Sequence, residues 1–382
     1  MKTYDVIVAG LGAMGSAALF QLAKSRVKVL GIDRFSPPHD LGSTHGETRL
    51  TRLAIGEGEE FVPLVMRTNE VWRELEEASG NKLLTTTGGL IFTSGEGGSV
   101  LHGSDILADT IRIARNFGIK HDILDHKELE SRFHDLKFEP NSRGYYEYGS
   151  GYLNPELCIE TNLGQARVHG AETAVNERII EIDETDGKVE IITSKDKYEC
   201  SRLLLSAGAW VNKLLGDRVP EKRFRIFRQV MIWFRGLSDY SDASFPVFIK
   251  GGSDEHSSYY GFPAVEGSDA IKIGIEQFET ESDPDAVDRS VSETDTRKAF
   301  ELVSKNFNIE PDPVKIKTCL YTVTEDFGFV VDFLPGSANI LVVSPCSGHG
   351  FKHSAGIGQL AKQMVLGEEP FTDVSRFRFE NS

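Results

Sequence analysis

A glycine-rich turn near the start of the chain constrains its fold more than any other feature. Residues 4–9 are short, apolar and β-branched, which predicts a buried strand, and the run Gly-Leu-Gly-Ala-Met-Gly follows at 10–15. A helical pattern then covers 13–25, and a second strand covers 27–32. This order predicts a dinucleotide-binding unit, in which glycines allow a tight turn, close approach of a pyrophosphate and close helix packing.

The glycines and the acid that follows them are the candidate contacts to the dinucleotide. Asp33 ends the second strand, eighteen residues after Gly15, where a carboxylate can accept hydrogen bonds from ribose hydroxyls. An acidic residue there disfavours the 2′-phosphate of NADP. The motif does not separate NAD from FAD, so both cofactors stay open on this evidence. The candidate contacts are Gly10, Gly12, Gly15 and Asp33.

Length and composition fit a protein with two packed units. The chain has 382 residues, more than the roughly 250–300 at which single cores stop growing. Its net charge of −16 argues against nucleic-acid binding, which needs a basic face. No apolar run reaches the roughly 18 residues of a membrane span, and the first three residues leave no room for a signal peptide. The four cysteines lack metal-ligand or redox spacing, so we expect a cytoplasmic protein with no metal site.

The middle of the chain predicts a second unit interleaved with the first. Strand-like runs at 89–92 and 230–233 and helical stretches near 104–117 and 295–306 indicate an α+β unit on a mixed or antiparallel sheet. Residues 155–216 return to the nucleotide-binding pattern. The predicted fold class is therefore α/β, with a Rossmann-like domain interleaved with a substrate domain. The expected bounds are 1–84, 152–222 and 318–382 for the Rossmann-like domain, and 85–151 and 223–317 for the substrate domain.

Several further motifs are spread over the whole chain. They are the runs at 42–52, 56–58, 207–210, 259–263, 271–274, 318–322 with Asp332, and 347–352. Together with the glycine turn, these runs resemble the family of monomeric sarcosine oxidase and N-methyltryptophan oxidase, which are flavin-dependent amine oxidases. The resemblance implies that the dinucleotide is FAD and the first domain an FAD-binding domain. It also implies further cofactor contacts at Arg34, Ser43, Thr44, Arg49, Val175, Gly208, Trp210, Gly348, His349, Gly350 and Lys352.

The resemblance implies roles for Cys319 and Lys272 that their local sequence patterns do not predict. Cys319 matches the cysteine whose sulfur bonds the 8α-methyl group of FAD, whereas a lone cysteine is usually a small buried hydrophobe. Lys272 lies in an alternating run at 270–275, which by itself predicts a side chain on a solvated face. In the family the matching lysine lies over the flavin and promotes reaction with O2. A fixed positive charge is suited to that task because it stabilises developing anionic oxygen.

Arg52 and Lys352 are the expected substrate clamp. An arginine fork can hold a carboxylate through two hydrogen bonds, and a lysine adds a point charge. The alternative is a surface ion pair, which contributes little to stability. The glycines at 348–350 precede a predicted helix at 351–366, whose positive N-terminal end would stabilise negative charge on a reduced flavin.

Glu276 is the clearest departure from sarcosine oxidase, which has a histidine four residues after its oxygen-activating lysine. A carboxylate there would favour hydroxyl donors or a second cationic group in the substrate. Fructosyl amino acid oxidases, which belong to the wider family, are similar in carrying glutamate at this point. Cys346 departs as well, since a larger apolar residue is usual before Ser-Gly-His-Gly. The candidate catalytic side chains are Lys272, Arg49, Glu276 and Tyr260.

The resemblance implies an FAD-dependent oxidase of a secondary amine, most simply an N-methyl type α-amino acid. The product imine would hydrolyse, and O2 would be reduced to hydrogen peroxide. The expected partners are this small substrate and O2, without nucleic acid or membrane, and the family implies a monomer. Three alternatives stay open: an oxidase of fructosyl amino acids or other bulky amines, a flavin dehydrogenase with another acceptor, and an amino-acid sensor without turnover.

Overall fold

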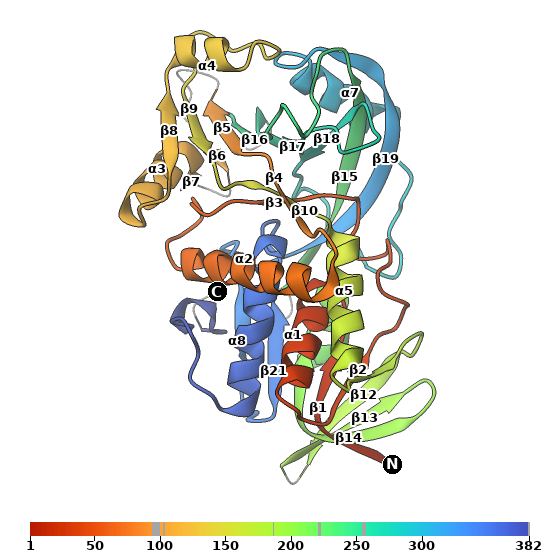
Figure 1. Ribbon diagram of the computed structural model, residues 1–382. Helices are drawn as coiled ribbons and strands as arrows, with labels where there is room; N and C mark the ends of the chain where they lie inside the picture. The colour runs from red at the N-terminus through yellow and green to blue at the C-terminus, as the bar shows by residue number, and fades with distance from the viewer. Residues whose placement is uncertain (94–99, 102–103, 186, 221–222, 254–256, 381–382) are drawn as a thin grey trace.

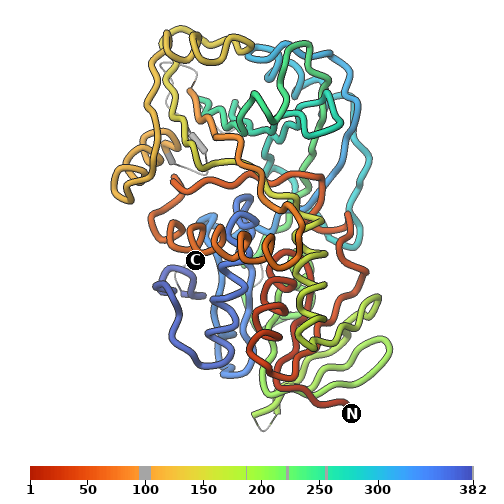
Figure 2. The backbone as a smooth tube through the Cα atoms, viewed as in Figure 1, coloured from red at the N-terminus to blue at the C-terminus, as the bar shows by residue number. Residues whose placement is uncertain are grey.

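The computed structural model describes residues 1–93, 100–101, 104–185, 187–220, 223–253 and 257–380. Two eight-stranded sheets organise the chain, one in each half of the elongated molecule (Figure 1). The chain passes between the halves several times, so that its first and last segments lie together in the lower half (Figure 2). This is the interleaved arrangement that the sequence predicts.

The lower sheet has a parallel core that begins at the glycine turn. Its parallel strands run in the order β11 (Glu172–Ala174), β2 (Val29–Ile32), β1 (Lys2–Ala9), β14 (Lys197–Leu205) and β21 (Ile340–Ser344). Three antiparallel strands extend it: β20 (Val330–Phe333), β13 (Lys188–Thr193) and β12 (Ile179–Thr185). The strands β2 and β21 of this core are buried along their whole length, as is typical of apolar runs in a parallel sheet.

Helices cover the lower sheet and supply much of its core. The helix α1 (Ala13–Lys24) packs between α5 (Pro155–Val168) and α8 (Ser354–Leu366), and α2 (Phe61–Ser79) crosses α8 (Figure 1). The side chain of Asn154 caps α5 by accepting from the N–H of Leu157, and Pro155 occupies its first turn, where a missing N–H costs nothing. A short turn and helix follow β14, namely Gly208–Trp210 and α6 (Val211–Leu215).

The upper sheet is antiparallel except at one pair of strands. Its order is β19 (Ile309–Val323), β15 (Arg225–Gly236), β18 (Ala270–Ile275), β17 (Tyr259–Phe262), β16 (Val247–Gly251), β5 (Gly89–Thr93), β9 (Gly144–Glu147) and β8 (His121–Leu124), with β16 and β5 parallel. Three helices lie around it: α3 (Ile106–Asn116), α4 (His126–Arg132) and α7 (Glu293–Val303). An aromatic core that includes Phe248 and Phe307 fills this half.

A small sheet joins the two halves. It consists of β3 (Arg49–Thr51), β10 (Gly151–Leu153) and β4 (Leu84–Thr86), with β10 in the middle. A separate pair, β6 (Val100–Leu101) and β7 (Ser104–Asp105), precedes α3. Because β3 carries Arg49 and leads into Arg52, this sheet places the arginine-bearing loop between the halves (Figure 1).

The predicted α/β class with a Rossmann-like half is confirmed. The division into sequence ranges stays a prediction, and its boundary between residues 317 and 318 falls inside the continuous strand β19. The helix predicted at 351–366 begins as a 3-10 turn, Phe351–His353, before α8.

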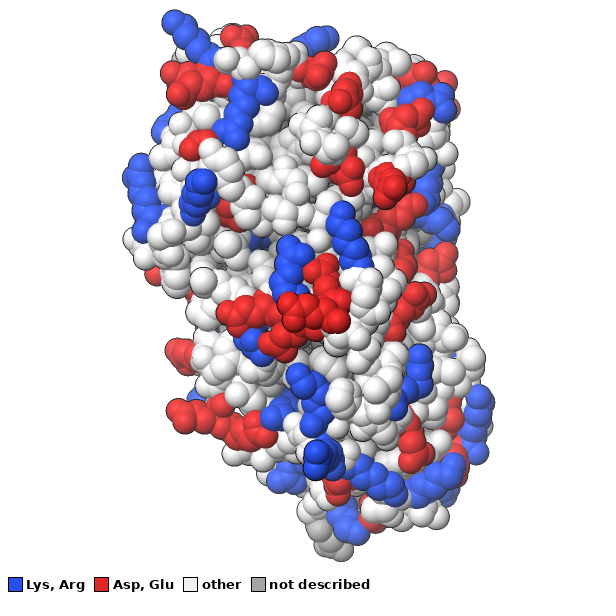
Figure 3. All heavy atoms as spheres, viewed as in Figure 1, with Lys and Arg blue, Asp and Glu red and all other residues white. Residues whose placement is uncertain are grey.

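Among the helices that the structure describes, none is both long and apolar enough to cross a membrane. On the face drawn in Figure 3, acidic and basic side chains are intermixed.

Candidate active site

A cavity of about 450 Å³ lies where the two halves meet. Its walls include sixteen of the predicted site residues: Gly10, Gly12, Asp33, Arg34, Ser43, Thr44, Arg49, Arg52, Gly208, Trp210, Tyr260, Glu276, Gly348, His349, Gly350 and Lys352. Four others are not among its lining residues, namely Gly15, Val175, Lys272 and Cys319. The structure thus brings most of the predicted residues to one site and leaves these four outside its lining.

The three glycines of the first turn have distinct geometries. Gly10 has a φ of +90°, and a Cβ there would lie 2.4 Å from the carbonyl oxygen of Ser206. A Cβ on Gly15 would lie 1.8 Å from the Gly10 carbonyl oxygen, whereas one on Gly12 would meet nothing within 4 Å. Gly10 therefore makes the turn and Gly15 allows the helix to pack, while Gly12 exposes its backbone to the cavity. A pyrophosphate needs this open backbone at a helix start.

Asp33 is held in place by the same turn. Its carboxylate accepts hydrogen bonds from the backbone N–H groups of Leu11, at 2.7 Å, and Phe35, at 2.8 Å. Burial raises the pKa of Asp33, and these two hydrogen bonds oppose that shift. Because each carboxylate oxygen accepts more than one hydrogen bond, Asp33 retains capacity for ribose hydroxyls. The turn and Asp33 therefore fit an FAD molecule.

An aspartate between β18 and α7 binds three other residues that line the cavity. Asp285 accepts hydrogen bonds from Arg34, at 2.5 Å, Trp210 Nε1, at 2.8 Å, and Lys213, at 2.7 Å. These hydrogen bonds, with Lys213 first, hold the pKa of Asp285 well below its usual range. Arg34 and Trp210 are thus fixed relative to each other by a residue that sequence reasoning missed.

The carboxyl-terminal motif makes a tight turn against the cavity. Ser347 and Gly348 have φ values of +40° and +80°, and a Cβ on Gly350 would lie 1.6 Å from the carbonyl oxygen of Pro345. The ring of His349 stacks on Phe329 with centroids 4.7 Å apart. This turn brings backbone N–H groups and the start of α8 to the wall, where they can stabilise an anion.

Arg52 and Lys352 lie in the cavity wall with a glutamate between them. Arg52 Nη2 donates to Glu57 Oε2 at 2.5 Å, and Lys352 Nζ lies 3.9 Å from Glu57 Oε1. Arg52 Nη1 donates to the Ala54 carbonyl at 2.6 Å, and among the described protein atoms its Nε has no acceptor. Burial lowers the pKa of Lys352 to about 8, while Glu57 opposes that change. The alternative of a surface ion pair is excluded, since the Arg52 and Lys352 side chains are only 4 % and 5 % exposed.

Lys272 is buried, which contradicts the prediction from its alternating pattern. Its Nζ donates to the carbonyls of Gly46, at 2.7 Å, and Thr48, at 2.9 Å, and to Thr48 Oγ1, at 3.2 Å. The ammonium also lies 4.7 Å from the ring centroid of Phe262. The loop at 46–48 covers the face of β18 that carries Lys272. A polar residue in the alternating pattern is therefore not exposed to solvent here. Burial and Arg49 lower the pKa of Lys272 well below its usual range.

Arg49 holds the loop that covers Lys272. It donates to the carbonyls of Thr48, at 2.8 Å, and Ser43, at 2.6 Å. His45 lies in this loop, and burial, followed by Arg49, lowers its pKa to about 3. A neutral His45 therefore belongs to the packing of the loop.

The wall of the cavity on the upper sheet is aromatic with one carboxylate. The hydroxyls of Tyr260 and Tyr321 are hydrogen-bonded at 2.9 Å, and Phe262, Ile249 and Glu276 line the cavity with them. Burial raises the pKa of both tyrosines, and the charge of Glu276 adds to the shift. Both tyrosines are therefore neutral hydrogen-bonding groups.

Two cysteines lie near this wall. Cys319 is a buried residue of β19, paired in register with Gln229 of β15, and burial raises its thiol pKa. Cys346 lines the cavity, and its Sγ lies 3.4 Å from the N–H of Thr322 as an acceptor.

Glu57, Asp285 and Tyr321 are among the cavity residues that sequence reasoning missed. Glu57 and Tyr321 lie within runs that carry the family resemblance, which could have singled them out. Asp285 lies in a run with no such signal.

Comparison with known proteins agrees with this site. The FAD dependent oxidoreductase family matches residues 5–364. The chain is 36 % identical to monomeric sarcosine oxidase of Bacillus sp. (strain B-0618) over 382 residues, covering 98 % of this chain and 95 % of the relative. It is 35 % identical to N-methyl-L-tryptophan oxidase of Salmonella heidelberg (strain SL476), covering 98 % of each. Its fold is similar to the open form of NikD, an unusual amino acid oxidase essential for nikkomycin biosynthesis. The TM-score is 0.86 at 20 % identity, over 99 % of this chain and 98 % of that one.

The chain belongs to the FAD dependent oxidoreductase family, within the group that includes monomeric sarcosine oxidase and N-methyl-L-tryptophan oxidase. The expectation of FAD rather than NAD is confirmed.

Proposed function

We propose that the protein oxidises a secondary amine of the N-substituted α-amino acid type and passes the electrons to O2. When bound, FAD takes a hydride from the carbon beside the amine nitrogen and returns the electron pair, with two protons, to O2 as hydrogen peroxide. The relatives named for sarcosine and N-methyl-L-tryptophan support this substrate class. We further propose that it acts as a monomer in the cytoplasm, which the likeness to monomeric sarcosine oxidase and the unpaired cysteines support.

The observation that carries the proposal is the pair of buried cations in the cavity. Arg52 and Lys352 contact the carboxylate of Glu57, and the charge of Glu276 also acts on Lys352. A substrate carboxylate would accept from the Arg52 Nε–H, which the described protein atoms leave without an acceptor. This arrangement favours an anionic substrate group.

The aromatic wall has a separate role, which is to exclude water from the amine. Tyr260, Phe262, Tyr321 and Ile249 line the same cavity as the clamp. Transfer of an ammonium into such surroundings disfavours its charged form. The substrate amine would therefore lose its proton on binding, as hydride loss from the neighbouring carbon requires, and no side-chain base is needed.

We assign the cofactor contacts to the glycine turn, Asp33, Arg34, Ser43, Thr44, Trp210 and the turn at 348–350. We also propose that the flavin is bonded to Cys319, which the family resemblance supports. Lys272 supplies the positive charge that favours electron transfer to O2. Its three hydrogen bonds to the loop at 46–48 hold that charge in place.

The proposed clamp is tested by Arg52→Ala with sarcosine and N-methyl-L-tryptophan as substrates. We expect KM to rise by about tenfold or more, since a charged hydrogen bond contributes about 1.5–3 kcal/mol. Because this change also leaves Glu57 without its arginine, the double variant Arg52→Gln/Glu57→Gln serves as its partner. An unchanged KM in both variants would exclude the clamp.

A second candidate is an oxidase of fructosyl amino acids or other bulky amines, favoured by Glu276 in the wall with Tyr260 and Tyr321. A carboxylate beside two hydroxyls suits a polyhydroxylated or cationic substituent. Anaerobic bleaching of the flavin by sarcosine, N-methyl amino acids and fructosyl amino acids separates the two. Peroxide formation in air then distinguishes an oxidase from a dehydrogenase, and bleaching by any amine excludes a sensor without turnover.

A further inference from the structure

The buried ammonium of Lys272 has only uncharged hydrogen-bond partners among the described residues. Its three donors go to the Gly46 and Thr48 carbonyls and to Thr48 Oγ1, which accounts for all three N–H bonds of an ammonium. The Thr48 carbonyl also accepts from Arg49 Nη1 at 2.8 Å, so two cations share one oxygen. A buried charge in this position needs a carboxylate nearby to remain ionised.

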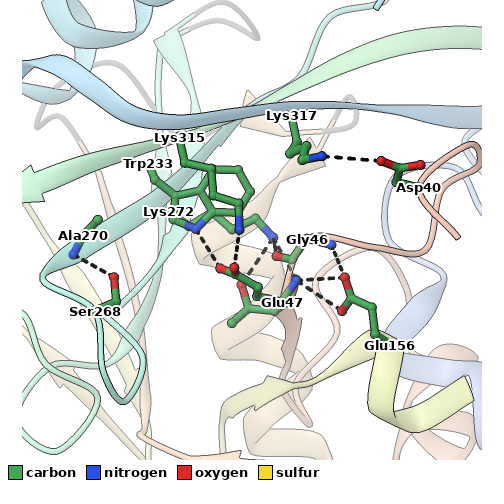
Figure 4. Close-up of polar contacts among 11 residues, drawn as sticks. Asp40, Gly46, Glu47, Glu156, Trp233, Ser268, Ala270, Lys272, Lys315 and Lys317 are labelled. Atoms are coloured by element: carbon green, nitrogen blue, oxygen red, sulfur yellow. Dashed lines mark hydrogen bonds and ion pairs between the residues drawn. The ribbon is translucent and has the colours of Figure 1, made fainter. Parts of the chain in front are cut away.

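A single peptide group links Lys272 to such a carboxylate. The C=O of the Gly46–Glu47 peptide accepts from Lys272 at 2.7 Å, and its N–H donates to Glu156 at 3.2 Å to Oε2 and 3.3 Å to Oε1. The preceding N–H, of Gly46, donates to Glu156 Oε1 at 2.6 Å. The C=O and N–H of a trans peptide point in opposite directions, so Lys272 and Glu156 lie on opposite sides of this group (Figure 4). Both charges polarise the peptide in the same sense.

The same peptide belongs to a strained turn. The N–H of Thr48 donates to the Gly46 carbonyl at 2.8 Å, and Glu47 at the centre has a φ of +70°. This is a γ-turn with positive φ, which is rare and strained for a residue with a side chain. Such a turn persists only where its surroundings hold it.

The side chain of Glu47 holds the turn from the side of the upper sheet. One carboxylate oxygen is ion-paired with Lys315 of β19, and the other accepts from Trp233 Nε1 of β15 at 3.1 Å (Figure 4). Glu156, from the first turn of α5, holds the turn from the lower half. The two glutamates thus fix the turn between the two halves of the molecule.

We propose that Glu156 and Glu47 are positioning residues for Lys272, with Glu156 keeping the ammonium charged through the Gly46–Glu47 peptide and Glu47 keeping the turn in shape. The inference rests on the proposed function, in which the Lys272 cation promotes reaction with O2. The charged and titratable groups with the largest effect on Lys272 are Arg49, Cys319, Glu156 and Glu47, and His45 also interacts with it. Burial and Arg49 lower the pKa of Lys272, whereas Cys319, Glu156 and Glu47 raise it.

The test uses Glu156→Gln in the flavin-loaded enzyme, with Glu160→Gln as the control. Glu160 is an exposed residue of the same helix, so its loss removes the same charge from α5. The flavin is reduced with dithionite, which makes the measurement independent of the substrate, and is then mixed with O2 at several pH values. We expect Glu156→Gln to be reoxidised about tenfold more slowly near pH 8. We also expect the pH at which the rate falls to move down by about one unit, because Lys272 loses its proton earlier.

Two readouts do not depend on turnover. The midpoint potential of the bound flavin should fall in Glu156→Gln above that lower pH, since a neutral lysine no longer stabilises the reduced form. Amide hydrogen exchange in a peptide that covers residues 46–48 should speed up, because the Gly46 and Glu47 N–H groups lose their carboxylate. Glu156→Asp, which retains the charge, should return the pH profile toward that of the unaltered protein.

Lys272→Met separates failure of this inference from failure of the proposed function. If Lys272→Met reoxidises normally, the proposed role of Lys272 is wrong. If Lys272→Met is slow but Glu156→Gln matches Glu160→Gln in rate and potential, Lys272 acts without Glu156 and the inference is overturned. If Glu156→Gln does not fold, Glu47→Gln decides, because the Glu47 and Lys315 side chains are 43 % and 38 % exposed and their loss disturbs the core less. Slower reoxidation is then expected, and an unchanged rate would contradict the proposal.

Discussion

The carboxylate of Glu57 accepts a hydrogen bond of 2.5 Å from Arg52, and both side chains are almost fully buried. Its second oxygen lies 3.9 Å from Lys352. The proposed substrate clamp therefore already contains one anion of the protein itself. A substrate carboxylate would bind beside Glu57 or in its place, and the affinity for anions should depend on this residue.

Glu57→Gln should bind carboxylates more tightly. Removing the carboxylate that contacts both cations makes their surroundings more positive, so the dissociation constant of acetate, followed by the flavin absorbance, should fall by about tenfold. The same change should destabilise the flavin-loaded protein by roughly 3–5 kcal/mol, since it breaks a buried pair.

Glu59→Gln is the matched control for Glu57→Gln. Glu59 is two residues away, is 42 % exposed and pairs with Arg112 at the surface, so neither acetate binding nor stability should change appreciably. Equal acetate affinities in the two variants would show that Glu57 does not compete for the clamp.

Carboxylate binding should weaken as the pH rises through about 8. Burial lowers the pKa of Lys352 to about 8, so the ammonium is charged below this pH and neutral above it. Acetate has no group that titrates there, which leaves Lys352 as the source of the change. In Glu57→Gln the inflection should lie at lower pH, because the glutamate that favours the charged form is gone. In Lys352→Met the acetate affinity should be weak and flat over the same range; a retained inflection would assign it to another group.

Cys319→Ala should release the flavin from the polypeptide. After acid precipitation, the flavin of the unaltered protein should stay with the pellet and fluoresce on a denaturing gel, while that of Cys319→Ala should appear in the supernatant. Cys346→Ala is the control, since Cys346 lies in the cavity wall itself. Flavin retained in Cys319→Ala but lost in Cys346→Ala would move the attachment to Cys346, and flavin lost from the unaltered protein would exclude a covalent bond.

Glu276→His should shift the substrate preference toward small N-methyl amino acids. Glu276 lines the cavity with Tyr260 and Tyr321, and its removal takes away the carboxylate that would bind a cationic or hydroxylated substituent. We expect kcat/KM for sarcosine to rise relative to that for a fructosyl amino acid by about tenfold. Glu279→Gln, a change at an exposed glutamate in the same loop, should leave the ratio as it is. An unchanged ratio of the two kcat/KM values in Glu276→His would show that Glu276 does not determine the substrate preference.

The features that the sequence predicts well are local in the chain. The turn from Gly10 to Gly15 and the acid at Asp33 lie within one strand–helix–strand unit. Their spacing in the sequence is therefore enough to predict their relative positions. The burial of Lys272 depends on a loop more than 200 residues away in the chain. The alternation of polar and apolar residues along β18 cannot indicate that this loop covers the strand. Asp285 likewise meets Arg34 and Trp210 only after folding, and no spacing in the chain relates them.

The strand β19 carries Lys315, Lys317, Cys319 and Tyr321 at every second position, and side chains two residues apart lie on one face of a strand. Its pairing with β15 places Lys315 opposite Trp233 and Cys319 opposite Gln229. Loss or gain of one residue between Lys315 and Cys319 would turn one of them to the other side of the sheet. Among relatives of this chain, insertions and deletions in that interval should therefore be confined to even numbers of residues.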